Sequence, residues 1–360
     1  ASSSGRSPPT PASPSPSTIV TTFVGSGWTP QIASRTIRIY LPRGYTNNTW
    51  KRFPVVYLHD GQNVFRPSVG FGNWGAEDAA NWEMGQGRAR EAILVGVDNT
   101  ANRCGEYLPP GDTIISSVCG GTVAGVGNLY ANFLIHNVRP TLDVNYRTLN
   151  DPANTLTLGS SLGGLISTYL GLRTNVFGGI GPMSPAYWAA PNFSGWIASN
   201  ATLGLRIYTD WGTDEGSDMW DYAWPVRDSL LRDGYAENKD LKTVIGCGQG
   251  HNEAAWSNRL PVALRFMLPI LEERNALAHL AYPPELKSVS WTPGLVATGS
   301  LATLMGWRYA MEVSSSVMES AAWSSVTTTE VENLPWSTRT FGVTNPTPGS
   351  SAVFFRANAR

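Results

Sequence analysis

Cysteine is scarce in this chain, and its scarcity excludes whole classes of protein. Three cysteines, Cys104, Cys119 and Cys247, are too few for a disulfide scaffold or a cysteine-rich metal site. A single disulfide remains possible. Cys104 and Cys119 flank a stretch rich in Gly, Ser and Pro. A disulfide between them would restrain that stretch, and a pair of free thiols is the alternative.

Long apolar runs and an excess of one charge are also missing. No run approaches the roughly 20 apolar residues that cross a membrane, so we expect no membrane partner. The 26 Lys and Arg nearly cancel the 27 Asp and Glu, so the chain lacks the positive field that binds nucleic acid. A neutral or weakly charged substrate fits this balance. Tryptophan, by contrast, is plentiful: the 14 Trp either fill the core or form platforms for sugar rings and other flat ligands.

The composition changes twice along the 360 residues, a length that exceeds the usual size of one domain. Residues 1–18 are rich in Ser and Pro and predict an extended linker. Residues 19–282 predict an α/β domain, and residues 283–360 predict a small all-β module. No signal peptide is recognisable at Ala1, so we expect the mature chain of a secreted bacterial-type protein, extracellular or periplasmic.

Short apolar runs alternate with longer amphipathic stretches between about residues 35 and 270, which indicates an α/β fold with a mostly parallel sheet flanked by helices. The predicted strands are 38–41, 55–59, 92–97, 155–158, 205–209 and 242–245. The predicted helices are 162–172, 225–233 and 254–271. After about residue 283, alternation with intervening turns predicts a β-sandwich with strands at 288–291, 307–313, 323–326 and 352–356.

A Gly-x-Ser-x-Gly pattern follows one of these predicted strands directly. Gly159 and Gly163 stand two places either side of Ser161, and a predicted helix comes next. A serine nucleophile stands at a sharp, strained bend between strand and helix, where small flanking residues let the backbone turn. Ser160 has leucines at the corresponding places. We therefore predict Ser161 as the nucleophile and the Leu162 N–H as a donor to an oxyanion; a plain tight connection is the alternative.

A serine hydroxyl needs an imidazole to take its proton, and the chain has four histidines. His136 lies in an amphipathic stretch and is expected to be structural. His279 falls in the connection to the β module. His59 ends a predicted strand upstream of the serine, whereas this kind of fold supplies its base last. His251 follows the last strand of the α/β region and precedes a helix, so it is the predicted base.

The imidazole in turn needs a carboxylate that fixes its tautomer and offsets its charge. That group is expected after a strand that lies between the serine and the histidine in the chain. Asp210 comes directly at the end of such a strand and is expected to cap the turn. Asp214 and Glu215 follow in the loop where the acid belongs, and composition does not separate them.

Taken together, these stretches resemble the α/β-hydrolase branch that contains esterase D-like enzymes, feruloyl and acetylxylan esterases, and mycolyltransferases. The resemblance covers about residues 30–270 and includes the Ser161 turn. Its further marks are residues 38–44, 56–63, 102–107, 184–188, 212–215 and 251–256. Several independent motifs in the family's order make the similarity more specific than one nucleophile turn.

The resemblance implies roles that the residues alone left open. In this family the acid is the last position of a Gly-Thr-x-Asp/Glu motif, which is Glu215 here, with Asp214 at the variable place. The loop after the second strand gives the other oxyanion donor, which is the backbone N–H of Gln62. His59 and Asp60 would brace that loop. The family's Arg-x-x-Glu-Tyr stretch, 103–107 here, lines the region near the active site, and Cys104 within it departs from the pattern.

The expected activity is a serine ester hydrolase that forms an acyl-enzyme and needs no metal or organic cofactor. Acetyl or feruloyl esters of plant polysaccharides are the leading substrates, because a linker, an appended module and many Trp fit an exported enzyme on such material. A short-chain carboxylesterase and an acyltransferase to a sugar hydroxyl are alternatives, and a non-enzymatic binding module is a third. The C-terminal stretches resemble fibronectin type III-like modules. The oligomeric state stays open.

Overall fold

The structure is a computed structural model. It describes residues 18–25, 27, 31–46, 48–66, 72–200 and 204–270, and the backbone of six strands between Glu285 and Ala359. The predicted linker lies outside the described residues except for Thr18, which opens the first strand. The predicted boundary at 282/283 also lies outside them, so the division into three segments stays a prediction.

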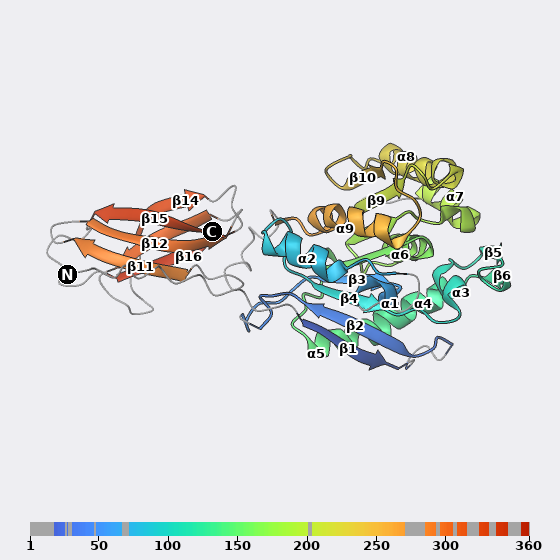
Figure 1. The fold of residues 1–360 in the computed structure, drawn as a ribbon, viewed down its shortest axis with the longest axis horizontal. Coiled ribbons are helices and arrows are strands. Elements are labelled where there is room, and N and C mark those ends of the chain that lie inside the picture. The colour runs from blue at the N-terminus through green and yellow to red at the C-terminus, as the bar shows by residue number, and fades with distance from the viewer. Residues whose placement is uncertain are drawn as a thin grey trace, which may run out of the picture.

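An eight-stranded sheet forms the centre of the α/β region (Figure 1). Strand β2 is antiparallel to both of its neighbours, and the six strands from β4 to β10 are mutually parallel. In spatial order the strands are β1 (Thr18–Val24), β2 (Arg35–Leu41), β4 (Ile93–Val97), β3 (Val55–His59), β7 (Thr155–Ser160), β8 (Gly179–Met183), β9 (Arg206–Gly212) and β10 (Leu241–Gly246). The predicted α/β-hydrolase type of fold is confirmed.

Six of these strands were predicted, and β1 and β8 were not. Strand β8 has the sequence Gly-Ile-Gly-Pro-Met, which lacks the β-branched run that marks a strand and contains a proline. Its glycines leave space for neighbouring side chains. A Cβ on Gly181 would lie 2.8 Å from both the Leu158 side chain and the Met267 sulfur. The composition of β8 is therefore set by the close packing of neighbouring elements and not by strand propensity.

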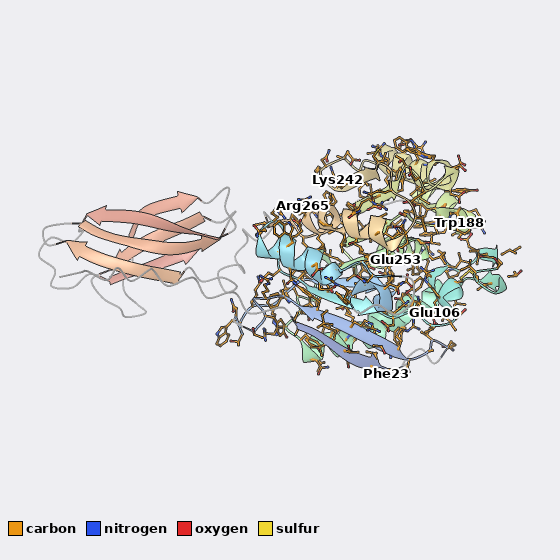
Figure 2. The ribbon with its side chains drawn as sticks, in the orientation of Figure 1. Phe23, Glu106, Trp188, Lys242, Glu253 and Arg265 are labelled. Carbon is orange, nitrogen blue, oxygen red and sulfur yellow. A yellow bond between two sulfur atoms is a disulfide. The ribbon has the colours of Figure 1, made fainter. Side chains whose placement is uncertain are left out.

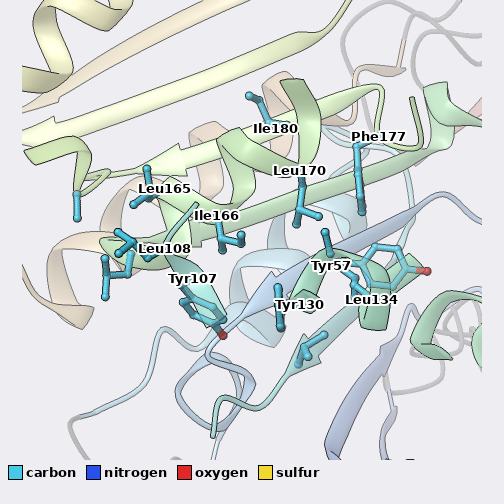
Figure 3. Packing of buried hydrophobic residues seen from close by; sticks show 14 of the residues in the cluster. Tyr57, Tyr107, Leu108, Tyr130, Leu134, Leu165, Ile166, Leu170, Phe177 and Ile180 are labelled. Atoms are coloured by element: carbon cyan, nitrogen blue, oxygen red, sulfur yellow. The ribbon is translucent and has the colours of Figure 1, made fainter. Parts of the chain in front are cut away.

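The helices cover both faces of the sheet, and alternation along β3 divides its side chains between the two. Val55 and Tyr57 enter the core cluster that Figure 3 shows in part, where the ring centre of Tyr57 lies 6.1 Å from that of Phe177. Val56 and Leu58 enter the cluster on the other face. Helices α4 (Gly127–Phe133), α5 (Arg139–Asn145), α6 (Leu162–Arg173), α7 (Pro191–Asn200) and α8 (Trp224–Arg232) contribute to the first cluster, and α1 (Gly61–Val64), α2 (Ala76–Gly85) and α9 (Glu253–Met267) to the second.

Three of these helices were predicted: α6, α8 and α9 coincide with the expected stretches, although α9 ends at Met267, earlier than expected. The C-terminal strands form two antiparallel sheets, ordered β11-β12-β15 and β14-β13-β16. The strands are β11 (Glu285–Thr292), β12 (Val296–Leu304), β13 (Arg308–Ser314), β14 (Ser324–Glu330), β15 (Trp336–Thr344) and β16 (Phe354–Ala359). The predicted all-β character is present, and the fibronectin type III-like resemblance stays a prediction.

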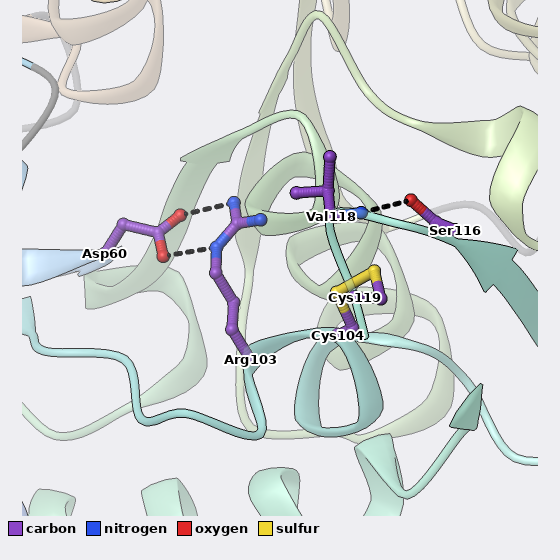
Figure 4. Close-up of a disulfide and its surroundings, with 6 residues drawn as sticks. All are labelled: Asp60, Arg103, Cys104, Ser116, Val118 and Cys119. Carbon is purple, nitrogen blue, oxygen red and sulfur yellow. Dashed lines mark hydrogen bonds and ion pairs between the residues drawn. A yellow bond between two sulfur atoms is a disulfide. The ribbon is translucent and has the colours of Figure 1, made fainter. Parts of the chain in front are cut away.

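Cys104 and Cys119 form a disulfide (Figure 4). Cys104 lies in the short helix α3 (Arg103–Tyr107), and Cys119 lies in the turn between strands β5 (Thr113–Ser116) and β6 (Gly121–Ala124). The bridge therefore attaches an otherwise exposed hairpin to α3. Of the two alternatives that the sequence left open, the disulfide is the one that occurs, and Cys247 is free and exposed.

Replacing both Cys104 and Cys119 with Ser is expected to lower the free energy of unfolding by about 3 kcal/mol, because the unfolded chain regains the freedom of a loop closed over 15 residues. Urea unfolding followed by tryptophan fluorescence measures the change. The matched control is Cys247→Ser, which removes a thiol that crosslinks nothing and is expected to unfold like the wild type. An unchanged midpoint in the double variant would contradict the expectation.

Candidate active site

Ser161 stands between β7 and α6 in a conformation that side chains rarely adopt. Its backbone has φ 58° and ψ −123°, a strained region typical of a residue that a fold forces into position. Close contacts surround both flanking glycines. A Cβ on Gly159 would lie 2.7 Å from the Gly163 backbone, and a Cβ on Gly163 would lie 3.3 Å from the Cβ of His59. Ser160, by contrast, is a buried end of β7.

Two backbone N–H groups lie beside this turn. Leu162 is the first residue of α6 after Ser161, so its N–H has no carbonyl four residues back within the helix. Gln62 lies in α1, directly after β3, and its side-chain oxygen accepts a hydrogen bond from the Asn99 N–H at 3.1 Å. The close approach of Gly163 to His59 brings the start of α6 against this loop. The two segments that were expected to supply oxyanion donors are therefore neighbours.

His251 and Glu215 form a direct pair. The Nδ1 atom of His251 lies 2.8 Å from Oε2 of Glu215. The Glu215 side chain is inaccessible to solvent, whereas that of His251 is 37% exposed. Helix α9 fixes the position of His251, because Asn252 caps the helix by accepting a hydrogen bond from the Ala255 N–H at 3.0 Å. An imidazole bonded at Nδ1 presents Nε2 for proton transfer.

The two neighbouring acids have different surroundings. The exposed Asp214 accepts a hydrogen bond from the Thr213 hydroxyl at 3.0 Å, and Glu215 is the one that contacts His251. Burial alone would raise the pKa of Glu215. Hydrogen bonds from His251, from the Ser184 hydroxyl at 2.7 Å and from the Gly212 N–H at 2.6 Å outweigh burial and lower that pKa below its usual range.

Ser184 lies at the centre of a buried hydrogen-bond network. It has φ 41° at the end of β8 and is fully buried. Its hydroxyl donates to Glu215 and accepts from Trp256 Nε1 and Arg259 Nη2, both at 2.9 Å. The network adjoins the nucleophile turn, because the Ser161 N–H donates to the carbonyl of Met183, the residue before Ser184, at 3.0 Å.

Arg259 lies between two buried carboxylates. Its Nη2 is 3.4 Å from Oε1 of Glu215, and its Nε is 3.0 Å from Oδ1 of Asp210. Burial raises the pKa of Asp210 to about 6 although Arg259 opposes the shift. Asp210 lies within β9 and also accepts a hydrogen bond from the Tyr208 hydroxyl at 2.7 Å, so it does not cap the turn as expected. Sequence reasoning gave no role to Arg259; its only signal was a charge on the apolar face of α9.

Asp60 and Arg103 shape the loop that carries Gln62. Asp60 has φ 59°, and Arg103 donates to both of its carboxylate oxygens at 2.7 and 2.8 Å (Figure 4). Burial would raise the pKa of Asp60, but the Arg103 charge and its hydrogen bonds lower it below the usual range. Because Arg103 precedes Cys104, the disulfide and this ion pair stabilise the same short helix. The expected bracing of the loop is consistent with these contacts.

His59 is buried and bonded on both sides. Its Nδ1 lies 2.8 Å from the Tyr130 hydroxyl, and its Nε2 lies 3.0 Å from the Thr157 hydroxyl. Burial lowers the pKa of His59 to about 3, so the ring is neutral near pH 7. His136 is exposed in the helical turn Leu134–Val138, and His279 lies outside the described residues. Within the described part of the chain, His251 is the histidine that contacts Glu215.

The described residues contain no group of three or more His, Cys, Asp or Glu side chains that could bind a metal ion. None of their helices combines the length and the apolar character that crossing a membrane requires.

Comparison with known proteins identifies the family of this chain. The model of the family described as "Putative esterase" matches residues 33–283. An uncharacterized protein, YbbA of Bacillus subtilis (strain 168), is 27% identical over 246 residues, which are 65% of this chain and 92% of that protein.

Solved structures show the same fold at low identity. A ferulic acid esterase matches with a TM-score of 0.54 and 18% identity, over 72% of this chain and 100% of that chain. An IroE-like serine hydrolase from Shewanella oneidensis matches with a TM-score of 0.57 and 17% identity, over 72% of this chain and 82% of the other.

The burial of His59 gives a pH dependence of stability. Its folded pKa of about 3 lies below the ordinary value of 6.5, so between about pH 6.5 and pH 3 the unfolded chain binds a proton at this residue and the folded chain does not. The free energy of unfolding that neutral His59 contributes is therefore present above this pH range and is lost as the pH falls through it. We expect a loss of about 2 kcal/mol between pH 7 and pH 5.

Urea titrations of the wild type and His59→Gln at both pH values measure this contribution. The amide of the variant can still bond Tyr130 and Thr157 but does not titrate, so its loss of stability between the two pH values is expected to be smaller by about 2 kcal/mol. Equal losses in the two proteins would show that the pKa of His59 is the same in the folded and the unfolded chain.

Proposed function

The chain belongs to the Putative esterase family and is a carboxylic ester hydrolase, and we propose that it works through an acyl-enzyme on Ser161. The observation that carries the proposal is the strained Ser161 at a strand-to-helix turn, in a network that also holds the Glu215–His251 pair. These are the parts that acyl transfer through a serine requires.

In the proposed reaction, Nε2 of His251 takes the proton of the Ser161 hydroxyl as its oxygen attacks the ester carbonyl. The N–H groups of Gln62 and Leu162 stabilise the oxyanion of the tetrahedral intermediate. His251 then gives its proton to the departing alcohol. Water, deprotonated by the same histidine, attacks the acyl-enzyme; the bond between the acyl group and the Ser161 oxygen breaks, His251 returns the proton to that oxygen, and the acid is released.

Glu215 fixes His251 in the tautomer with the proton on Nδ1 and stabilises the imidazolium that forms during each step. Ser184 and Arg259 are positioning residues for Glu215. They contact its Oε1 atom, which leaves Oε2 directed at His251. The lowered pKa of Glu215 supports this role, because the group stays ionised over the pH range in which a histidine can act as base.

For the substrate we propose acetyl or feruloyl esters of plant polysaccharides. Aromatic side chains lie on two segments that follow the strands of the site. Trp188, on the turn Tyr187–Ala189, is 38% exposed; Trp220 and Tyr222, on the segment Met219–Ala223, are 42% and 39% exposed. The two segments are in contact. Exposed rings of this kind suit a flat phenolic acyl group or a sugar ring.

We further propose that the protein is exported and that the C-terminal strands form a separate fibronectin type III-like module. The disulfide supports the first point, since such bridges persist in oxidising compartments. The two antiparallel sheets of residues 285–359 support the second. Acyl transfer to a sugar hydroxyl is the alternative outcome, and transesterified product in the presence of a carbohydrate acceptor would reveal it.

Ser161→Ala is expected to lower kcat for p-nitrophenyl acetate by at least about 10⁴-fold, because the nucleophile is lost. The variant is also expected to resist labelling by a fluorophosphonate probe, which reacts only with an activated serine. Ser160→Ala is the control at the neighbouring position and is expected to be labelled. Full activity in Ser161→Ala would overturn the assignment of the nucleophile.

Glu215→Gln is expected to lower kcat by about 10³- to 10⁴-fold, because an amide can bind His251 in the wrong tautomer. Asp214→Asn is the matched control one residue earlier. Its side chain is exposed, and a change within about twofold is expected. Steady-state kinetics on a short aryl ester decide between them, and a larger loss in Asp214→Asn would reverse the choice of acid.

A further inference from the structure

A surface groove lies between helices α2 and α9, which lie side by side in Figure 1. It has a volume of about 370 Å³, within the range of small-molecule sites. Figure 2 labels Glu253 and Arg265, which mark the ends of α9. We call this feature the α2–α9 groove. Its walls include Trp74, Asp78, Ala79 and Trp82 on one side and Ser257 and Pro261 on the other.

Helical spacing explains why these side chains meet. Asp78, Ala79 and Trp82 are separated by one turn or less and share one face of α2, and Ser257 and Pro261 are one turn apart on α9. Ala79 is small, which leaves room between the helices. Pro261 cannot donate the amide hydrogen bond that the Ser257 carbonyl would receive in a regular helix.

Trp82 gives the groove an exposed aromatic surface. Its side chain is 59% exposed, and the guanidinium of Arg88 lies 5.3 Å from the centre of its ring. Large apolar side chains are normally buried on a helix that packs against a sheet. An exposed indole supported by a neighbouring side chain is a flat surface on which the C–H face of a sugar ring can pack.

The charged groups of the groove pair with one another. Arg66 donates to Glu77 Oε1 at 3.2 Å and also forms an ion pair with Asp78. Because two carboxylates neutralise this guanidinium, the groove offers no strong attraction for an anion such as phosphate. It retains donors and acceptors for hydroxyl groups, in Arg66, Asp78 and the neighbouring Asn73. This combination fits an uncharged polyhydroxyl ligand.

The groove is joined to the candidate active site by two aromatic contacts. Trp74 in its wall lies 6.0 Å from Trp256, and Trp256 lies 5.1 Å from the ring of His251, measured between ring centres. The wall of the groove is therefore in contact, through the ring of Trp256, with the ring of His251.

We propose that the α2–α9 groove is a binding subsite for neutral pyranose units of a polysaccharide whose ester group lies at Ser161. Trp82 packs against a sugar ring, and Arg66, Asp78 and Asn73 bond its hydroxyls. The role given to this subsite rests on the proposed function. Binding itself does not require hydrolysis, so the two can be tested apart.

Binding is measured by calorimetry on the full chain carrying Ser161→Ala, with xylohexaose and cellohexaose as probes. At least one of them is expected to bind. Adding Trp82→Ala is expected to weaken that binding about tenfold, as the loss of an aromatic anchor does. Trp50→Ala, at a tryptophan that is 84% exposed and outside the groove, is the matched control and leaves binding unchanged. The C-terminal strands are the same in all variants.

Turnover gives the second measurement. The ratio of kcat/KM for an esterified xylo-oligosaccharide to kcat/KM for p-nitrophenyl acetate is expected to fall about tenfold in Trp82→Ala. Trp82→Phe, which keeps an aromatic ring, is expected to recover most of that ratio, which excludes misfolding as the cause. No binding of either oligosaccharide, or equal binding with and without Trp82, overturns the subsite. Activity that survives Ser161→Ala overturns the proposed function and leaves the binding result standing on its own.

Discussion

The buried charge of Glu215 is the constraint on which the arrangement of this site depends. Its side chain has no access to water, and a carboxylate in that position requires donors from the protein. The donors come from four places in the sequence: the end of β8, the end of β9, the loop before α9 and α9 itself. The sheet order β7-β8-β9-β10 brings the ends of these strands together beside the Ser161 turn.

Ser184 shows how closely this convergence is specified. A hydroxyl has one proton and two lone pairs, and Ser184 uses them all: it donates to Glu215 and accepts from Trp256 and Arg259. The hydroxyl reaches this point because the backbone turns to φ 41° at the end of β8. Arg259 meets a second requirement, since it lies against both Asp210 and Glu215. Without it, two buried carboxylates would face each other without a compensating charge.

The parts that could be predicted from sequence are those that depend on local order along the chain. The glycine frame indicated that Ser161, and not Ser160, stands at the strand-to-helix turn, and most parallel strands could be recognised by their apolar runs. Chain order pointed to His251 among four histidines, and His251 is the one that contacts Glu215 among the described residues. Strand β8 was missed because close packing, not strand propensity, sets its composition. The choice between Asp214 and Glu215 needed a family resemblance, because which of them turns inward is decided by contacts with distant residues.

Ser184 marked the family resemblance, but neither it nor Arg259 could be given a role from sequence, for a related reason. A serine after a strand and an arginine on a helix are ordinary in sequence. Their significance comes from burial beside an ionised group, which only the assembled fold creates. The disulfide lay between these cases: two cysteines flanking a loop made a bridge reasonable, but the pairing also depends on where α3 lies relative to the hairpin.

Trp256 connects the interior of the site to its surroundings. Its indole N–H donates to Ser184, its ring contacts His251, and the same ring lies against Trp74 in the wall of the α2–α9 groove. A side chain with a polar edge and a large apolar face can make all three contacts at once. Trp256 therefore joins the wall of the α2–α9 groove to the Glu215–His251 pair and to Ser184 by direct contact.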